Sequence, residues 1–207
     1  MKKTIHLFVG ILFSSLCFAQ SMSKQYHLKH NIRQENQQYE FTVMDFKANG
    51  VYAYDKSKFY YWLKAQTVHA TQGYSSGLLL HGEFQGFYDN KQLSKRGYFY
   101  KGLKNGEWLY WNENGVLIHI EHWKSGIKSG VEKKFDAQGQ LLSKIRYGKF
   151  KTTYQTKDSL LVQYNRQNKT QVTLFDSKGK KTQVIRKKED RLHGRQESYT
   201  DGKKSQV

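Results

Sequence analysis

Two groups of residues in this chain have the types and spacing of chemical sites. The first is His119-x-Glu121-His122, because histidine and glutamate are common zinc ligands. On a β-strand, however, residues three apart point to opposite faces, so His119 and His122 could not bind one ion together. The second is the pair Glu83 and Glu107, two carboxylates that could act as acid and base. Each stands directly after a glycine at the same phase of a repeat, which favours a structural role.

Other signatures of catalysis are missing from the sequence. It contains no glycine-rich phosphate loop, no serine elbow and no cysteine–histidine pair. A hydrolase would need a pocket that unites His119 or His69 with a carboxylate. The single cysteine, Cys17, lies near the start of the chain, which leaves the remainder without disulfides or thiolate metal ligands. We therefore expect a noncatalytic protein without a metal or cofactor.

Positive charge is the other feature with a chemical consequence. The 207 residues include 35 Lys and Arg against 17 Asp and Glu, a net charge of +18, which favours an anionic partner. Residues 142–207 hold 17 basic and 6 acidic residues, so most of the excess is C-terminal. A solvated basic face and an attachment site for lipid headgroups or lipopolysaccharide both fit this pattern. The candidate contacts are the densest group: Lys178, Lys180, Lys181, Arg186, Lys187 and Lys188.

The first residues have the pattern of an export signal. Two lysines precede the apolar run Ile5–Phe18, which is too short for a permanent transmembrane helix. We expect residues 1–19 to be a signal peptide, cleaved after Ala19, and the mature chain to be periplasmic or secreted without a membrane span. A lipoprotein acylated at Cys17 is the alternative, although Leu16 stands where a lipobox has a small residue.

An internal repeat of 24 residues predicts the secondary structure that carries the histidine and glutamate residues described above. Segments 82–93, 106–117 and 130–141 align without a gap. Asn114-Gly115 fits a type I′ turn, and the flanking runs alternate as strands do, so each unit is predicted to be a β-hairpin. Stacked hairpins would bury rows of repeated apolar residues. The repeated positions are Gly82, Phe87, Leu93, Phe99, Gly102, Gly106, Trp108, Trp111, Gly115, Leu117, Trp123, Gly126, Gly130, Phe135, Gly139, Leu141 and Tyr147.

The first unit departs from the pattern at its turn. Lys91 occupies the position that Gly115 and Gly139 hold in the next two units. A left-handed backbone there would cost a lysine roughly 1 kcal/mol. Lys91 therefore predicts either a strained turn or a turn of another type.

The pattern resembles MORN repeats, in the variant found in YwqK-type proteins. The matching run is Phe99-x-x-Gly102-x-x-x-Gly106-x-Trp108-x-x-Trp111-x-x-x-Gly115, followed by Trp123-x-x-Gly126-x-x-x-Gly130 with Phe135 and Gly139. Departures are Glu132 at the position of Trp108, and Phe150 at that of the linker glycine. The resemblance implies a noncatalytic binding module and, through the YwqK group, an antitoxin or immunity-like role.

Together these patterns predict an all-β protein, an elongated stack of antiparallel hairpins with irregular caps. We expect residues 20–58 to be partly ordered with a strand at Tyr39–Phe46, residues 59–81 to form a capping hairpin, and residues 82–150 to form three repeats. Residues 151–207 would hold an insertion with a strand near Leu160, two degenerate repeats and the basic region.

The function predicted first is an exported noncatalytic binding module or scaffold that recognises a protein or an anionic envelope component. The alternative is an antitoxin-like protein that binds and blocks a toxin. Export disfavours nucleic acid as the partner, and it fits poorly with a cytosolic antitoxin.

Overall fold

The computed structural model describes residues 28–44, 53–166, 168–189, 191–201 and 203–205. The predicted signal peptide, its cleavage site and Cys17 lie outside this part of the chain and stay predictions. In the part that is described, no helix has the length and apolar character needed to cross a membrane.

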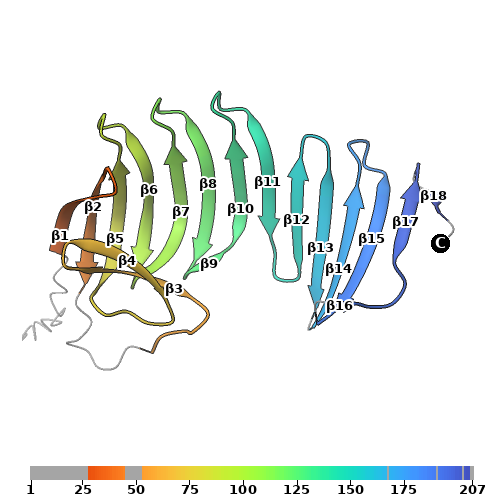
Figure 1. Ribbon diagram of the computed structural model, residues 1–207, viewed down its shortest axis with the longest axis horizontal. Helices are drawn as coiled ribbons and strands as arrows, with labels where there is room; N and C mark the ends of the chain where they lie inside the picture. Colours follow the sequence, from red (N-terminus) through yellow and green to blue (C-terminus); the bar gives the residue numbers. More distant parts are fainter. Residues whose placement is uncertain (1–27, 45–52, 167, 190, 202, 206–207) are drawn as a thin grey trace, which may run out of the picture.

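The described residues form an elongated all-β stack of antiparallel hairpins, which confirms the predicted fold class (Figure 1). Hairpins follow one another along one continuous sheet, and only β3 and β4 leave this order to cross its face. The strands are β1 Leu28–Gln34, β2 Gln37–Met44, β3 Phe59–Lys64, β4 Thr67–Gln72, β5 Leu78–Phe87, β6 Leu93–Tyr100, β7 Leu103–Trp111, β8 Leu117–Lys124, β9 Ile127–Lys128, β10 Gly130–Phe135, β11 Leu141–Tyr147, β12 Lys151–Thr156, β13 Leu160–Arg166, β14 Lys169–Phe175, β15 Lys181–Lys188, β16 Arg191–Leu192, β17 Glu197–Thr200 and β18 Lys203–Lys204.

The three predicted repeats are the hairpins β5–β6, β7–β8 and β10–β11. Their registers are equivalent, since each repeat glycine pairs with the aromatic residue 17 positions later in the chain. Each register also shifts at the same place, just before the turn, where a β-bulge accommodates one extra residue. The hairpin β14–β15 has the same shift, between Leu174 and Phe175, as expected of a degenerate repeat.

The turn of each repeat is not the predicted type I′ turn. Asn112 accepts hydrogen bonds at its side-chain oxygen from the amides of Asn114 and Val116, and its carbonyl accepts one from Gly115. Gly115 has a φ of 76°, whereas Asn114 keeps a negative φ. This is a type I turn that ends in a left-handed residue and a bulge. Lys91 adopts a φ of 65° in the first unit, so that turn keeps the same shape with a strained residue.

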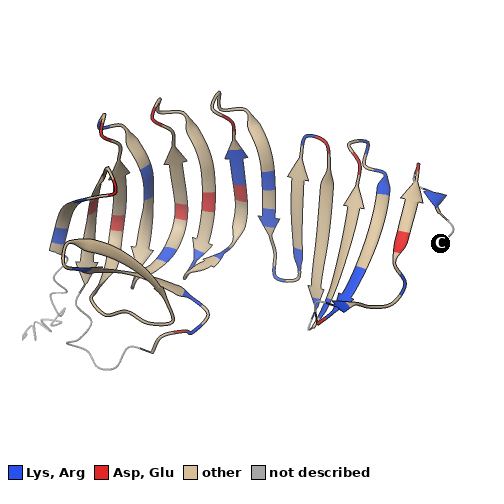
Figure 2. Cartoon of the chain, viewed as in Figure 1, with Lys and Arg blue, Asp and Glu red and all other residues tan. Residues whose placement is uncertain are grey.

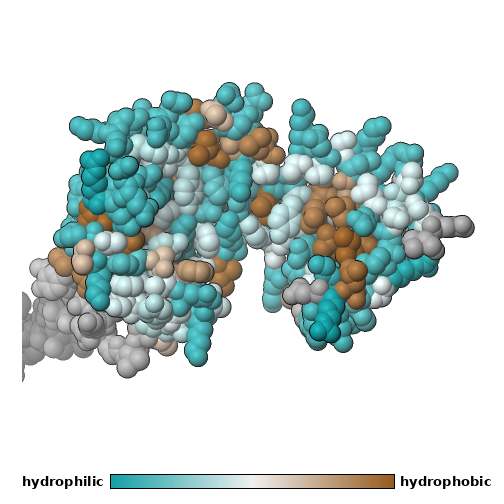
Figure 3. All heavy atoms as spheres, viewed as in Figure 1, coloured by the Kyte–Doolittle hydropathy of each residue, from teal (hydrophilic) through white to brown (hydrophobic). Residues whose placement is uncertain are grey.

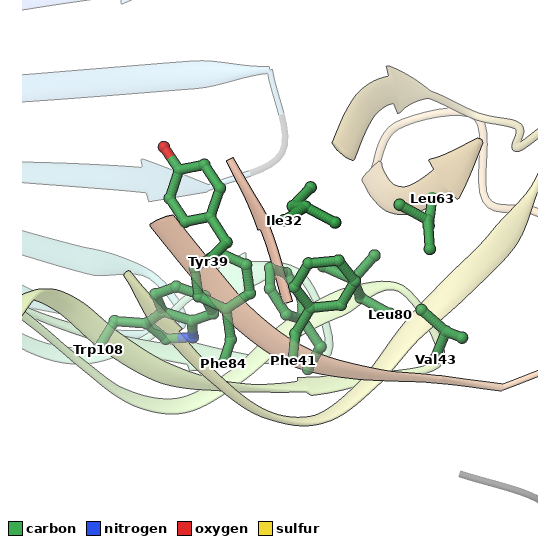
Figure 4. Packing of buried hydrophobic residues seen from close by; sticks show 9 residues of the cluster. Ile32, Tyr39, Phe41, Val43, Leu63, Leu80, Phe84 and Trp108 are labelled. Atoms are coloured by element: carbon green, nitrogen blue, oxygen red, sulfur yellow. The ribbon is translucent and has the colours of Figure 1, made fainter. Parts of the chain in front are cut away.

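The main core lies on one face of the sheet, under β3 and β4, and we call this the inner face. A second, smaller buried cluster contains Tyr60, Trp62, Leu79 and Leu103. Ile32, Tyr39, Phe41, Val43, Leu63, Leu80, Phe84, Phe99 and Trp108 form the main buried cluster (Figure 4). The predicted rows are only partly correct. Phe99 is buried, but Trp111 and Trp123 are half-buried and Leu141 is 52% exposed.

Trp108 is buried as deeply as Phe99, because it lies under the aromatic cluster. Its side chain is 2% exposed and occupies the space where a Cβ on Gly97 would stand. Phe99 and Phe84 contact it with ring centroids 4.8 and 5.7 Å away. Phe84, Trp108 and Glu132 occupy the same position in the three repeats, which we call the Trp108 column. This position therefore faces the core more directly than the positions of Trp111 and Trp123 do.

Residues 59–81 contain the expected hairpin, but its place differs from the prediction. It does not cap the end of the stack. Instead β3 pairs with β5 through Trp62 and Leu63, and the hairpin crosses the inner face (Figure 1). The end of the sheet is formed by β1 and β2, with β2 paired to β5. Strand β1 was missed because its sequence has only Ile32 as a buried apolar residue.

The C-terminal half, β11 to β18, is a thinner structure. Among its described residues only Val162, Thr173 and Val184 are buried, and no second layer covers either face there (Figure 1). The insertion forms β12 and β13, of which only β13 was predicted. Figure 3 shows apolar side chains gathered over β13 to β15 on the inner face.

Candidate functional site

Two of the residues singled out in the sequence, His119 and Glu121, belong to an ionic network on the inner face. Glu121 on β8 and Glu132 on β10 are 7% and 3% exposed. The Lys128 ammonium contacts both, at 3.0 Å from Glu121 and 2.6 Å from Glu132. Lys104 lies 3.3 Å from Glu121, and His119 Nε2 lies 2.9 Å from Glu132. Two lysines thus neutralise two buried carboxylates.

Hydroxyl and indole groups complete the hydrogen bonds of this network. Tyr110 and Trp123 donate to Glu121 at 2.7 and 3.0 Å, and Tyr147 donates to Glu132 at 2.6 Å. Burial alone would raise the pKa of Glu121, but Lys104 and these donors lower it to about 2. Burial would also raise the pKa of Glu132, but hydrogen bonds from Lys128 and Tyr147 lower it. Both carboxylates stay ionised at neutral pH, which suits an ion pair and not a general acid.

A metal ion does not fit these residues as they are arranged. His119, Glu121 and Glu132 offer ligand atoms that all lie within 4.8 Å of one another. The ammonium of Lys128, however, contacts both carboxylates and occupies the position that a cation would take. Sequence reasoning missed Glu132 as a partner because it comes from the next hairpin. It correctly separated His119 from His122, which contacts Glu107 and the Val131 carbonyl instead.

Glu83 and Glu107 are both exposed and lie beside a shallow groove on the outer face. Each has its own neighbour on the adjacent strand. Glu83 lies 3.7 Å from Arg96, and Glu107 lies 3.4 Å from His122. The two carboxylates occupy equivalent positions in successive repeats, but Glu107 contacts the residue directly opposite it and Glu83 a diagonal one. These separate cross-strand contacts favour a structural role.

The six predicted cationic contacts do not form one cluster. Lys178 and Lys180 lie at the β14–β15 turn, whereas Lys187 and Lys188 lie at the opposite end of β15. An eight-residue strand separates these ends by roughly 20 Å. Some of the group also have partners in the last strands, as Lys180 lies 3.6 Å from Asp201, Arg186 lies 3.6 Å from Glu197, and Lys181 stacks over Tyr199.

Strand register brings together a different set of cations, which we call the basic row. Arg166 pairs with Lys169, Lys169 with Lys188, and Lys188 with Arg191. Directly paired residues share a face, so these four side chains lie side by side across β13 to β16. All four are exposed, and no carboxylate of the described residues lies within ion-pair distance of them. Figure 2 shows basic residues gathered at this end of the strands.

The basic row lies on the outer face, opposite the ionic network. Successive cross-strand pairings place Glu132, Ile145, Tyr154 and Leu161 on the inner face. Side chains alternate between faces along a strand, and Arg166 is five residues from Leu161, so Arg166 and the row lie on the outer face.

A second line of side chains runs beside the row on this outer face. It contains Lys151, Tyr164 and Arg186, and Lys151 lies 5.4 Å from the centre of the exposed Tyr164 ring.

Like charges directly opposite each other on a sheet destabilise it. The basic row therefore has a cost for folding and no compensating partner in the part of the chain that the structure describes. Sequence reasoning could not find it, because its members are up to 25 residues apart and only the hairpin pairing aligns them.

The comparisons with known proteins agree with the repeat geometry. The model of a MORN repeat variant matches residues 80–101, 104–125 and 128–149, which are the hairpins β5–β6, β7–β8 and β10–β11 with their linkers. The chain thus contains three consecutive MORN-type repeats, and such repeats indicate a repeat-based binding module. No curated protein matches the chain.

Proposed function

We propose that this protein is an exported, noncatalytic binding module that attaches to an anionic component of the cell envelope. The observation that supports this proposal best is the basic row, Arg166, Lys169, Lys188 and Arg191. Cross-strand pairing puts these four cations on one exposed face, and no carboxylate of the described residues lies within ion-pair distance of them. Neighbouring strands are about 4.8 Å apart, so the four charges span roughly 14 Å.

The open sheet allows a flat anionic surface to approach the whole row at once. A basic residue near such a surface contributes about 1 kcal/mol, so four acting together would give roughly 4 kcal/mol. Lys151 beside the row would add to this attraction. The leader sequence supports the location, since two lysines, an apolar run and a small residue precede the folded part.

The test uses the mature chain and its retention on vesicles. Replacing Arg166, Lys169, Lys188 and Arg191 together by glutamine should reduce retention on anionic phospholipid vesicles at least tenfold, and wild-type retention should fall as salt rises. Retention on lipopolysaccharide, measured in parallel, identifies the preferred component. Thermal stability should be unchanged or slightly raised, because the mutual repulsion is removed.

A matched control removes the same charge from elsewhere. Lys56, Lys91, Lys124 and Lys134 are exposed and lie outside the basic row. Their joint replacement by glutamine should leave most of the retention intact. If both quadruple variants lose retention equally, net charge alone explains the binding and the proposal fails.

Export and the toxin-blocking alternative have their own tests. Intact mass of the exported protein should give a chain that begins at Gln20, whereas an acylated chain beginning at Cys17 would identify a lipoprotein. An antitoxin-like role predicts that one protein partner co-purifies at equal stoichiometry and stays bound to the basic-row variant. Such a result would favour the alternative over envelope attachment.

A further inference from the structure

A cavity of about 240 Å³, open to solvent on one side, lies between the inner face and the β3–β4 hairpin, on the opposite side of the sheet from the basic row. Phe84, Phe99 and Trp108 from β5, β6 and β7 contribute apolar walls. Tyr61 of β3 and Val68 of β4 contribute the opposite side. The volume is just below the range of about 300 to 1,000 Å³ typical of small-molecule pockets, so it suits a ligand with a single ring.

The hairpin over this cavity is held in place by hydrogen bonds from two directions. The Gln34 side chain accepts from the Val68 amide at 3.0 Å and donates to the Val68 carbonyl at 3.4 Å. The Tyr61 amide donates to the Gly102 carbonyl at 2.7 Å. These contacts connect the hairpin to β1 and to the β6–β7 turn, so the space is a fixed part of the fold.

The charges beside the cavity leave one cation without a partner. In the ionic network Lys104 and Lys128 balance Glu121 and Glu132. Lys95 also lines the cavity and is half-buried, yet no carboxylate of the described residues lies within ion-pair distance of it. Burial and the positive charge of Lys104 lower the pKa of Lys95, and Glu35 partly opposes this shift. A partly buried ammonium of this kind favours an anion as its neighbour.

Hydrogen-bond donors remain available at the same place. The Lys95 ammonium donates to the Tyr39 hydroxyl at 3.3 Å and lies 4.7 Å from the centre of that ring, which leaves further N–H groups unused. The Tyr61 hydroxyl has no hydrogen-bond partner among the described residues, whereas the Tyr39 and Tyr110 hydroxyls donate to Gln37 and Glu121.

We propose that this cavity binds a small organic monoanion, a carboxylate carried on one flat ring. The ring lies over the closely packed Phe84, Phe99 and Trp108, beneath Val68, and the carboxylate accepts hydrogen bonds from Lys95 and Tyr61. One unbalanced ammonium sets the charge of the ligand at minus one. This site is independent of the proposed envelope attachment, because the two lie on opposite faces and use different residues.

The experiment uses 4-fluorobenzoate as the probe and follows its fluorine resonance as the mature protein is added. Wild-type protein should bind it saturably, and the neutral analogue 4-fluorobenzyl alcohol should bind at least tenfold more weakly. Lys95→Met keeps the aliphatic stem but removes the charge, and it should weaken the carboxylate about tenfold or more, as expected for a charge-assisted hydrogen bond. Lys124→Met, on an exposed residue of β8, should leave binding unchanged.

A second variant tests the cavity without changing charge. Val68→Phe places a larger side chain in the cavity, so it should abolish binding while far-UV circular dichroism and the melting temperature show a folded protein. The proposal is overturned if wild-type protein fails to bind the probe, if the alcohol binds as tightly as the carboxylate, or if Lys95→Met and Lys124→Met have equal effects. Vesicle retention should be the same for wild-type and Lys95→Met protein, which separates this site from the basic row.

Discussion

Lys91 is a residue whose type conflicts with the backbone that it must adopt. Its φ of 65° is the left-handed conformation that Gly115 and Gly139 hold in the next two repeats. The shape of the turn is therefore set by the repeat as a whole, through the bulge and the two backbone hydrogen bonds across the turn, and the single side chain gives way to it.

This conflict predicts that Lys91→Gly stabilises the protein. Removing the Cβ relieves strain of about 1 kcal/mol, less the extra backbone entropy of glycine in the unfolded chain. Urea unfolding should therefore show a gain of a few tenths to about 1 kcal/mol. The reciprocal change, Gly115→Lys, should destabilise by a similar or larger amount. Loss of stability in Lys91→Gly would mean that the lysine side chain makes a contribution that its backbone strain does not reveal.

The tryptophans of the second repeat differ in how deeply they are buried. Trp108→Ala should lower the free energy of unfolding by about 3 to 5 kcal/mol, since its ring is 2% exposed and packs under the aromatic cluster. Trp111→Ala and Trp123→Ala remove half-buried rings and should cost less, with the effect of Trp123 including its hydrogen bond to Glu121. Far-UV circular dichroism in denaturant measures all three. Equal effects would contradict the placement of the core around Trp108.

At the scale of elements, an ionic network replaces aromatic packing where the repeat pattern departs from its own consensus. Glu132 stands in the column of Phe84 and Trp108, and its burial is tolerated because Lys128 and Tyr147 contact it. Both partners come from the adjoining strands β9 and β11. Glu132, which replaces an aromatic residue, and the two residues that stabilise its charge thus belong to one hairpin with its linker. The ionic network also connects this hairpin, through β10, to β8.

This network predicts loss of stability in acid. The pKa of Glu121 is lowered from 4.5 to about 2 in the folded protein, because the favourable effect of Lys104 and its donors exceeds that of burial. A folded-state pKa below the unfolded value adds stability above about pH 4.5, and this is lost as the pH falls towards 2. Glu121 alone accounts for up to about 3 kcal/mol.

Thermal melts of wild-type protein and Glu121→Gln between pH 7 and 2 test this expectation. The variant should be less stable at pH 7, and the difference should shrink as the pH falls. Curves that stay parallel throughout would show that Glu121 does not contribute to the acid sensitivity.

At the scale of the whole molecule, the two halves of the sheet differ in how much they bury. The N-terminal half has two packed clusters and a hairpin across its inner face. In the described part of the C-terminal half only three side chains are buried, and basic residues face each other across several strands. In a repeat stack each unit is stabilised mainly by its neighbours, so the halves need not open together.

Hydrogen exchange should reveal this difference. Amides of β5 to β8 should be protected at least tenfold more than those of β12 to β15, because fewer apolar contacts oppose opening in the C-terminal strands. Raising the salt concentration should increase protection in β13 to β15 by screening the repulsion along the basic row. Uniform protection along the sheet, unaffected by salt, would indicate a single cooperative unit.

The class of the fold, the three repeats and the separation of His119 from His122 could all be predicted before the structure. These follow from local rules, because a period of 24 residues, turn glycines and alternation along a strand are all properties of neighbouring positions. The depth of burial depends on what covers a face of the sheet, which local rules do not reveal. For this reason the sequence analysis placed Trp111 and Trp123 in the core and did not predict that Trp108 is buried more deeply than either.

Contacts between residues far apart in the chain could not be predicted in this way. The β3–β4 hairpin crosses the inner face and creates the cavity at Lys95, Glu132 joins His119 and Glu121 from another hairpin, and pairing of four strands forms the basic row. Each juxtaposition depends on register and on the path of a hairpin across the sheet. Those are set by the sum of many weak contacts along the stack, and no single segment of sequence contains them.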